Sequence, residues 1–471
     1  LGNIHKHFII HRDINPKNIL YNEATKEVKI INFNRAAALA GDNPGTANPD
    51  ILEGTFHYLS PEQTGRMNRP LDYRSDFYSL GIVLYEMLTG SLPFKGDDAL
   101  ELVYSHLTKN PLPLYKLRRG IPVTISNIVM KLMAKMPEDR YQSVFGLISD
   151  LKECRRQVDT NEVIEEFEVG RNDVPARFSI PEKLYGRDKE IKTLIDTFNW
   201  VSSNQAELLL VTGNAGVGKT SLVSELYKPI AVKRGYFLSG KFEQMKRNIP
   251  YSSIIQAFQG FVKQLLIESE EKIHSRKEEL LNILHNNGRI ITDVIPEVEL
   301  IIGPQPRVTD LPPQETQNRF NLVFRDFVCA FAAQDRPLII FLDDLHWADT
   351  ASLNLLEIFL TGPDTKYILF IGAFRDNEVD DLHPLMLMLS RIKSAGAAVH
   401  TLRLDPLRNS DVCRLISAAL NCSLPEAKLL AELCRKKTGG NPLFLKELLT
   451  FCHKEGLIRF DDRIGKWLWD A

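Results

Sequence analysis

The stretch Gly213–Thr220 (GNAGVGKT) has the residue types and spacing of a loop that binds the phosphates of a nucleoside triphosphate. It matches the pattern G-x-x-x-x-G-K-[ST] at every fixed position, namely Gly213, Gly218, Lys219 and Thr220. Glycines let backbone N–H groups turn toward phosphate oxygens, and the start of a helix adds a positive dipole end. Lys219 would reach the β- and γ-phosphates, and the Thr220 hydroxyl would ligate Mg²⁺. The residues between the fixed positions would complete the loop; they are Asn214, Ala215, Gly216 and Val217.

The sequence around the loop has the order that phosphate binding requires. An apolar run at Leu208–Val211 precedes the loop, and the helix-compatible stretch SLVSELY follows it. The alternative is a chance glycine-rich turn, which would need neither a strand before it nor a helix after it. We therefore expect a domain that binds a nucleoside triphosphate together with Mg²⁺.

Charged residues follow two further apolar runs, each predicted to be a buried strand. Asp343 and Asp344 come directly after Leu338–Leu342. Asp343 would hold Mg²⁺ through water, and Asp344 would orient or deprotonate the attacking water. A solvated turn or a helix cap is the alternative for such an acidic pair. Arg375 ends the run Tyr367–Phe374, where it would act either as a phosphate sensor or as a surface ion-pair partner.

The composition of the whole chain limits the classes of protein and partner. The 471 residues are 44% hydrophobic and 25% charged, with a net charge of −2, which predicts a soluble protein of two to four domains. No long basic run appears, so we expect no nucleic-acid partner. The apolar runs are far shorter than the roughly 20 residues of a membrane-spanning helix, and no signal peptide is visible. Six scattered cysteines without a CxxC pair indicate an intracellular, cytoplasmic protein.

The motifs of the second half occur in a characteristic order. YGRDKEI at 185–191, the phosphate loop, FLDDLHWAD, the strand ending in Arg375 and TGGNPLFLKELL at 438–449 follow one another. Together they resemble the AAA-like regulatory ATPases known as STAND proteins, over roughly residues 180–455. The resemblance implies that Tyr185 and Arg187 lie against the nucleotide base and that Pro442 packs near adenine. It also implies a switch in which bound nucleotide sets the position of a helical lid, with slow hydrolysis.

A second set of motifs lies in the first 155 residues. IHRDINPKNIL resembles the catalytic loop of protein kinases, with Asp13 in the place of the proton acceptor and Asn18 in the place of a metal ligand. Further matches resemble the end of the activation segment, the central helix of the large lobe and the arginine that pairs with the activation segment. They are Ser60-Pro61-Glu62, Asp76 and Arg140. The resemblance implies the fold of a kinase large lobe.

Two positions of this lobe depart from the kinase pattern. Asn32 stands where the metal-binding aspartate of D-F-G is expected, so the negative charge that holds Mg²⁺ is missing. Asn15 stands where a phosphate-contacting lysine is usual. The chain also begins within the catalytic-loop region, so we interpret it as a fragment without the glycine-rich small lobe. We therefore predict that this segment does not phosphorylate a peptide.

The combined order of motifs defines the expected organisation. A kinase-like lobe, the phrase LSPEQTGRMNR and a following ATPase resemble large hybrid signalling proteins that continue into GAF-type sensor and histidine-kinase modules. We expect a multidomain protein in which a mainly α kinase-like large lobe is followed by an α/β P-loop NTPase with a helical lid. The predicted boundaries are 1–155 for the lobe, 156–180 for a linker, 181–405 for the ATPase core and 406–471 for the lid and the start of the next module.

Three functions are compatible with these motifs. The first is an ATP-binding signalling switch coupled to a kinase-like domain within a larger sensor kinase, with signalling proteins or downstream modules of the same chain as partners. The second is an active Ser/Thr kinase with a regulatory ATPase, which Asp13 and Asn18 favour and Asn15 and Asn32 oppose. The third is a non-catalytic scaffold, which the intact phosphate loop opposes. The sequence does not identify the upstream signal or the protein substrate.

Overall fold

The computed structural model divides the chain into two compact units, which are described separately here. The first contains residues 1–183, 409–434 and 446–471, and the second contains residues 184–408 and 435–445. The structure describes residues 1–38, 55–67, 71–96, 98–161, 163–173, 178, 180–246, 249–266, 268, 270–461 and 466–469.

The kinase-like part of the first unit is built around one buried helix, α2 (Arg74–Thr89). Its side chains Phe77, Tyr78 and Ile82 have no exposed surface, and they pack among the other helices of the lobe. Short strands precede this helix and pair antiparallel, β1 with β4 and β2 with β3. The elements are α1 (Gly2–Lys6), β1 (Ile9–Ile10), β2 (Ile19–Tyr21), β3 (Val28–Ile30), β4 (Ala37–Ala38), α3 (Ala99–Thr108), α4 (Leu114–Leu117), α5 (Val123–Leu132) and α6 (Val144–Asn161).

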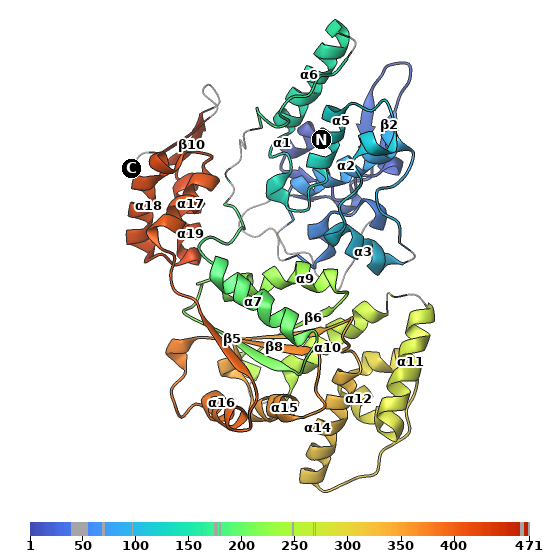
Figure 1. The fold of residues 1–471 in the computed structure, drawn as a ribbon, viewed down its shortest axis with the longest axis vertical. Helices are drawn as coiled ribbons and strands as arrows, with labels where there is room; N and C mark the ends of the chain where they lie inside the picture. Colours follow the sequence, from blue (N-terminus) through green and yellow to red (C-terminus); the bar gives the residue numbers. More distant parts are fainter. Residues whose placement is uncertain are drawn as a thin grey trace. The chain divides into compact units, whose positions relative to one another are not determined.

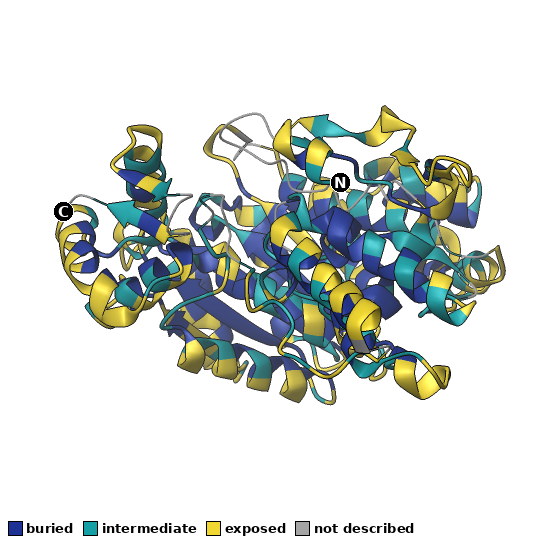
Figure 2. Ribbon diagram, turned by 90° about the horizontal axis from the view of Figure 1, so that it is seen from above, coloured by how far each residue is buried: buried dark blue, intermediate teal, exposed yellow. Residues whose placement is uncertain are grey.

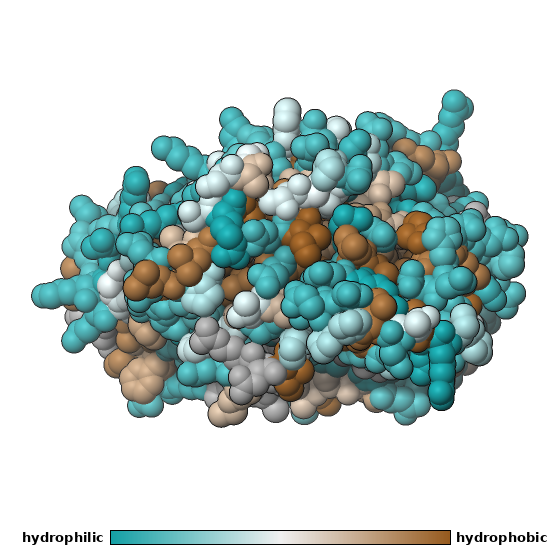
Figure 3. Space-filling view, turned by 90° about the horizontal axis from the view of Figure 1, so that it is seen from below, coloured by the Kyte–Doolittle hydropathy of each residue, from teal (hydrophilic) through white to brown (hydrophobic). Residues whose placement is uncertain are grey.

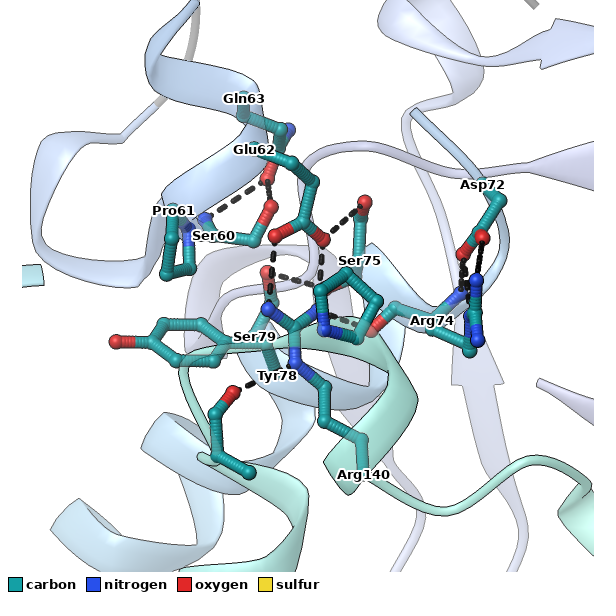
Figure 4. A network of polar contacts seen from close by, with 12 residues as sticks. Ser60, Pro61, Glu62, Gln63, Asp72, Arg74, Ser75, Tyr78, Ser79 and Arg140 are labelled. Atoms are coloured by element: carbon teal, nitrogen blue, oxygen red, sulfur yellow. Dashed lines mark hydrogen bonds and ion pairs between the residues drawn. The ribbon is translucent and has the colours of Figure 1, made fainter. Parts of the chain in front are cut away.

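An ion pair buried within this lobe joins two segments far apart in the sequence (Figure 4). The Arg140 guanidinium donates to both carboxylate oxygens of Glu62, at 2.6 and 2.7 Å, and Ser75 donates to the same carboxylate at 2.6 Å. Burial alone would raise the pKa of Glu62, but the charge and hydrogen bonds of Arg140 outweigh it and lower that pKa. The segment containing Glu62 is thereby fixed to the helical core of the lobe.

The segment after the lobe is more ordered than the predicted linker (156–180) suggests. Helix α6 continues to Asn161, and apolar side chains beyond it pack against the core of the lobe, namely Ile164, Phe167 and Val169. Asp173 then accepts hydrogen bonds from the backbone N–H groups of Gln142 and Ser143, at 2.6 and 2.9 Å. These apolar residues follow no helical or strand period, which is why the sequence pattern predicts a linker there.

The second unit contains a fully parallel sheet of five strands in the order β6-β7-β8-β5-β9 (Figure 1). Three of the strands lie where the apolar runs predict them: β5 (Glu207–Thr212), β7 (Leu338–Asp343) and β8 (Ile368–Phe374). The other two are β6 (Tyr236–Lys241) and β9 (Val399–Arg403). The carboxyl ends of the strands share one edge of the sheet, where ligands bind in open parallel α/β folds.

Alternate side chains of the sheet face two different helical layers, as the pleat requires. Leu209, Ile339 and Ile371 pack with α7 (Asp188–Val201) and the helical run after the phosphate loop. Leu208, Ile340 and Phe370 pack with the helices of the opposite layer. Both faces are therefore covered, and the central strands are buried (Figure 2). The remaining helices of this unit are α8 (Lys219–Val223), α9 (Tyr227–Val232), α10 (Ser252–Leu265), α11 (Glu270–Leu284), α12 (Gly288–Val294), α13 (Glu299–Ile302), α14 (Pro313–Cys329), α15 (Thr350–Thr361) and α16 (Pro384–Ser394).

The C-terminal region is helical where the sequence predicts helices, and it ends in a hairpin. Its elements are α17 (Asn409–Ala419), α18 (Leu424–Thr438), α19 (Pro442–Lys454), β10 (Ile458–Asp461) and β11 (Lys466–Trp469). No helix in the described ranges is long and apolar enough to cross a membrane. On the face shown in Figure 3, hydrophilic side chains surround the apolar ones.

The buried pair gives a stability prediction. Arg140→Ala leaves the Glu62 carboxylate buried without its cation, and this change is expected to lower the free energy of unfolding of the lobe by about 3–5 kcal/mol. Hydrogen exchange of the α2 amides measures the loss. Arg156→Ala, which removes an ion pair with Glu153 on the surface of α6, is the matched control and should leave the exchange nearly unchanged. Unaltered α2 protection in Arg140→Ala would contradict the assignment.

Candidate nucleotide site

The phosphate loop lies between the carboxyl end of β5 and the start of α8. Three of its glycines, Gly213, Gly216 and Gly218, have φ values of 142°, 75° and 98°, a region that favours glycine. A Cβ on Gly213 would also lie only 2.6 Å from the Leu404 carbonyl oxygen. Among the described residues, no acceptor takes up the backbone N–H groups of Gly216 and Gly218. The loop therefore has N–H groups free to bind an anion, which fits a nucleotide phosphate.

Lys219 is buried at the base of this loop. Its ammonium group donates to the carbonyl oxygens of Gly213 and Asn214, at 2.8 and 3.1 Å. Burial lowers the pKa of Lys219, and the nearby Asp343 charge acts against this effect. Lys219 thus links the two ends of the loop by hydrogen bonds. Its ammonium group lies within the loop that the sequence predicts to bind phosphate.

The predicted metal-side residues Thr220 and Asp343 are in direct contact. The Thr220 hydroxyl donates to Asp343 Oδ2 at 3.0 Å, and the backbone N–H of Asp344 donates to Asp343 Oδ1 at 2.9 Å. Hydroxyl and carboxylate oxygens are ligands that Mg²⁺ prefers. Within the described residues, no group of three or more His, Cys, Asp or Glu side chains could hold a metal ion by itself. This arrangement fits an ion bound by few protein oxygens and completed by phosphates and water.

Asp344 and Arg375 lie together at the same edge of the sheet. The Asp344 carboxylate is 3.5 Å from Lys241 Nζ and 3.8 Å from Arg375 Nε. Arg375 also donates to Glu378 at 2.7 Å. The sequence analysis did not identify Lys241 or Glu378. Lys241 ends β6 and is in register with Asp343 on β7, so locating that strand would have pointed to it.

Of the residues assigned to the nucleotide base by resemblance, Arg187 contacts the loop directly. The Arg187 guanidinium donates to the carbonyl oxygens of Asp405 and Val217, the latter at 3.5 Å. Tyr185 lies just before α7 and is half-buried. Pro442 is the first residue of α19, directly after a turn that also contacts the loop. Contact of Tyr185, Arg187 and Pro442 with a base remains a prediction.

The kinase-like cleft contains the other predicted site. Asp13 accepts hydrogen bonds from the side-chain amides of Asn15 and Asn18, at 2.9 and 3.1 Å, and from the Thr55 hydroxyl at 3.3 Å. The side-chain oxygen of Asn18, Oδ1, in turn accepts from the Asn32 side-chain amide at 3.2 Å. The oxygen that would ligate a metal is thus occupied by a neighbouring donor. One hydrogen bond thus joins the two amides.

Asp76 holds the backbone of this cleft from the central helix α2. Its carboxylate has no exposed surface and accepts from the backbone N–H groups of His11 and Arg12, both at 2.9 Å. His5 contributes a further contact to the same carboxylate at 2.9 Å. The backbone before Asp13 is therefore held in a fixed conformation, including Arg12 at a φ of 66°.

Comparison with known proteins identifies both regions. Residues 1–149 match the protein kinase domain model, and residues 183–371 match the AAA ATPase domain model. Over 90% of its length the chain is 32% identical to hybrid signal transduction histidine kinase G of Dictyostelium discoideum. Over 87% of its length it is 23% identical to peroxide stress-activated histidine kinase mak3 of Schizosaccharomyces pombe. It spans only 15% and 20% of these proteins, respectively. Over 31% of its length it is 41% identical to serine/threonine-protein kinase PknB of Mycobacterium tuberculosis, strain H37Rv.

The amide pair in the kinase-like cleft gives a prediction about metal binding. Asn32→Asp removes the donor to Asn18 and adds a charge, so the variant should bind Mn²⁺ at one site more than the unchanged chain. Electron paramagnetic resonance of free Mn²⁺ counts the bound ions. Asn34→Asp, which adds the same charge two residues away at an exposed position, is the control and should gain no site. Equal Mn²⁺ binding by the two variants would show that Asn32 does not keep the cleft free of metal.

Proposed function

We propose that this chain, in which a protein kinase domain is joined to an AAA ATPase domain as in hybrid signalling histidine kinases, is an ATP-operated switch within a larger sensor kinase. One contrast carries the proposal. In the ATPase domain the Thr220 hydroxyl and the Asp343 carboxylate meet beside a loop with free N–H groups. In the kinase domain the residue in the place of the metal-binding aspartate is the neutral amide Asn32, which donates to the Asn18 side chain and adds no negative charge.

The residues of the ATPase domain have distinct roles in this proposal. The backbone N–H groups of Gly216 and Gly218 bind phosphate oxygens, and Lys219 exchanges its carbonyl partners for the β- and γ-phosphates. Thr220 and Asp343 hold Mg²⁺, which neutralises phosphate charge when it is bound. Arg375 lies close enough to the site to respond to the terminal phosphate.

The position of Asp344 favours a switch over rapid turnover. Orienting a water molecule beside the terminal phosphate would compete with the ion pairs of the Asp344 carboxylate with Lys241 and Arg375. Arg375 is itself held by Glu378 at 2.7 Å. Hydrolysis then requires rearrangement of these charges in addition to the movement of the Lys219 ammonium group that nucleotide binding requires. Long-lived bound states are what a signalling switch needs.

Contacts between the linker and the C-terminal helical segment supply a route from the ATPase to the kinase domain. The Phe178 ring stacks on His453 of α19 with ring centres 4.8 Å apart, and its edge meets Trp467 of β11. Glu182 forms an ion pair with Lys446 of α19 at 2.8 Å. The chain between the two domains is therefore attached to the helix that begins at Pro442, and movement of that helix would pull on the linker.

Binding of ATP tests the switch directly. At an ATP concentration one hundred times the Kd, a ligand bound only by the folded state stabilises it by about 2.7 kcal/mol. We expect ATP with Mg²⁺ to raise the unfolding temperature of the ATPase domain, and Lys219→Ala to lose this rise. Lys228→Ala, on the exposed side of α9, is the matched control and should retain it. No stabilisation of the unchanged chain would favour the non-catalytic scaffold.

Phosphotransfer by the kinase domain tests the second candidate, an active Ser/Thr kinase. Because Asn32 lacks the charge that holds Mg²⁺, transfer from ATP to a Ser/Thr peptide should stay at background in the full-length protein. Asp13→Ala should therefore change nothing. Radiolabelled phosphate incorporation measures both proteins. Robust Mg²⁺-dependent transfer that Asp13→Ala abolishes would establish the active kinase and overturn this part of the proposal.

A further inference from the structure

Asn441 connects two elements of the second unit through the two ends of one side chain. Its amide nitrogen donates to the carbonyl oxygen of Ala215, in the phosphate loop, at 2.8 Å. Its amide oxygen accepts from the backbone N–H of Leu443 at 3.0 Å and from that of Phe444 at 3.5 Å. The oxygen therefore caps the first turn of α19, with Pro442 at the first helical position, which lacks an N–H group. The amide can perform both tasks at once because it carries its donor and its acceptor on two separate atoms.

A second contact joins the same elements beside Asn441. The backbone N–H of Leu443 lies 3.2 Å from the carbonyl oxygen of Gly216. A Cβ on Gly216 would lie 2.8 Å from Leu443 Cβ and 2.9 Å from Asn441 Oδ1, and the φ of Gly216 is +75°. The loop and the start of α19 thus approach more closely than a side chain at position 216 would permit. Glycine at this position serves the contact as well as the conformation of the loop.

The turn that carries Asn441 is itself fixed to the ATPase core. The Gly440 carbonyl oxygen accepts from the backbone N–H of Leu407 at 2.8 Å. A Cβ on Gly440 would lie 2.5 Å from the Leu407 carbonyl oxygen, and the φ of Gly440 is +80°. The backbone N–H of Asn441 donates to Thr438 at 3.1 Å. Asn441 is therefore presented to the loop from a defined position.

Both contacts use carbonyl oxygens of the loop and leave its N–H groups available. Ala215 and Gly216 accept bonds from α19 and its cap, whereas phosphate binding needs the N–H groups of the same loop. The two kinds of contact do not compete. A loop held in one conformation from its carbonyl side has less conformational entropy to lose when it binds phosphate.

We propose that Asn441 is a positioning residue of the ATP site, which holds the apex of the phosphate loop in its binding conformation and links the occupancy of the loop to the first turn of α19. This inference rests on the proposed function, because it assumes that the loop binds ATP. This role requires no contact of Asn441 with phosphate or base. It acts through the Ala215 carbonyl group on one side and through the helix cap on the other.

Two substitutions separate the contact to the loop from the helix cap. Asn441→Ser keeps a good cap without adding charge, but its hydroxyl is too short to reach Ala215. Asn441→Ala loses the cap and the contact together. Asn354→Ser, at an exposed position on α15, is the matched control. Each variant is titrated calorimetrically with ATP and Mg²⁺, and hydrogen exchange of the first turn of α19 is measured with and without ATP.

The expected result is that Asn441→Ser and Asn441→Ala weaken ATP binding alike, by about threefold to tenfold, the effect of losing one hydrogen bond. In the unchanged chain and in Asn354→Ser, ATP should slow exchange at the first turn of α19. In Asn441→Ser this slowing should disappear although ATP still binds at saturating concentration. A role in capping alone would leave Asn441→Ser equal to the unchanged chain and weaken only Asn441→Ala, which would overturn the proposal.

Two further outcomes distinguish this inference from the proposed function. If ATP binds the unchanged chain but does not slow exchange at α19, the link to the helix is wrong and the ATP switch still has its site. If ATP binds neither the unchanged chain nor the control, the proposed function fails and the inference fails with it. The first result counts against the inference alone, whereas the second counts against the proposed function as well.

Discussion

A loop that offers its N–H groups to phosphate has to be held in shape by its other polar atoms, and the second unit is organised around this constraint. Every carbonyl oxygen from Gly213 to Val217 accepts a hydrogen bond. The donors are Lys219, Asn441, Leu443 and Arg187. They come from the helix after the loop, from α19 and the turn before it, and from the segment before α7. The loop is thus the point at which distant parts of the ATPase domain meet.

The kinase-like cleft satisfies its polar groups in the opposite way. Asp13 is surrounded by amide and hydroxyl donors, and Asn32 donates to the oxygen of Asn18 that would otherwise face a metal. A charged residue at position 32 would leave two oxygens facing each other and would need a cation between them. With Asn32, the polar side chains of the cleft are joined by hydrogen bonds from neutral donors. The fold of the domain is retained because its support lies elsewhere, in Asp76 and in the Glu62–Arg140 pair.

The two domains are joined by a chain segment that is attached at both of its ends. Asp173 binds backbone N–H groups of the kinase lobe, and Phe178 stacks on His453 of α19. Helix α19 begins beside the phosphate loop and continues to the residues that contact the linker. The proposed coupling would act through this helix.

The sequence alone determined those features whose chemistry is local. Buried parallel strands are nearly continuous apolar runs, which located β5, β7 and β8, and the loop and Asp343 follow such runs directly. Strand β6 alternates in burial and was not recognised, so Lys241 was missed. The docking of residues 163–173 was missed because its apolar residues follow no regular period. Asn441 and Ala215 are 226 positions apart, and no local pattern encodes their contact. Only the tertiary structure decided which loop atoms remain free for phosphate, because that choice depends on donors brought together by folding.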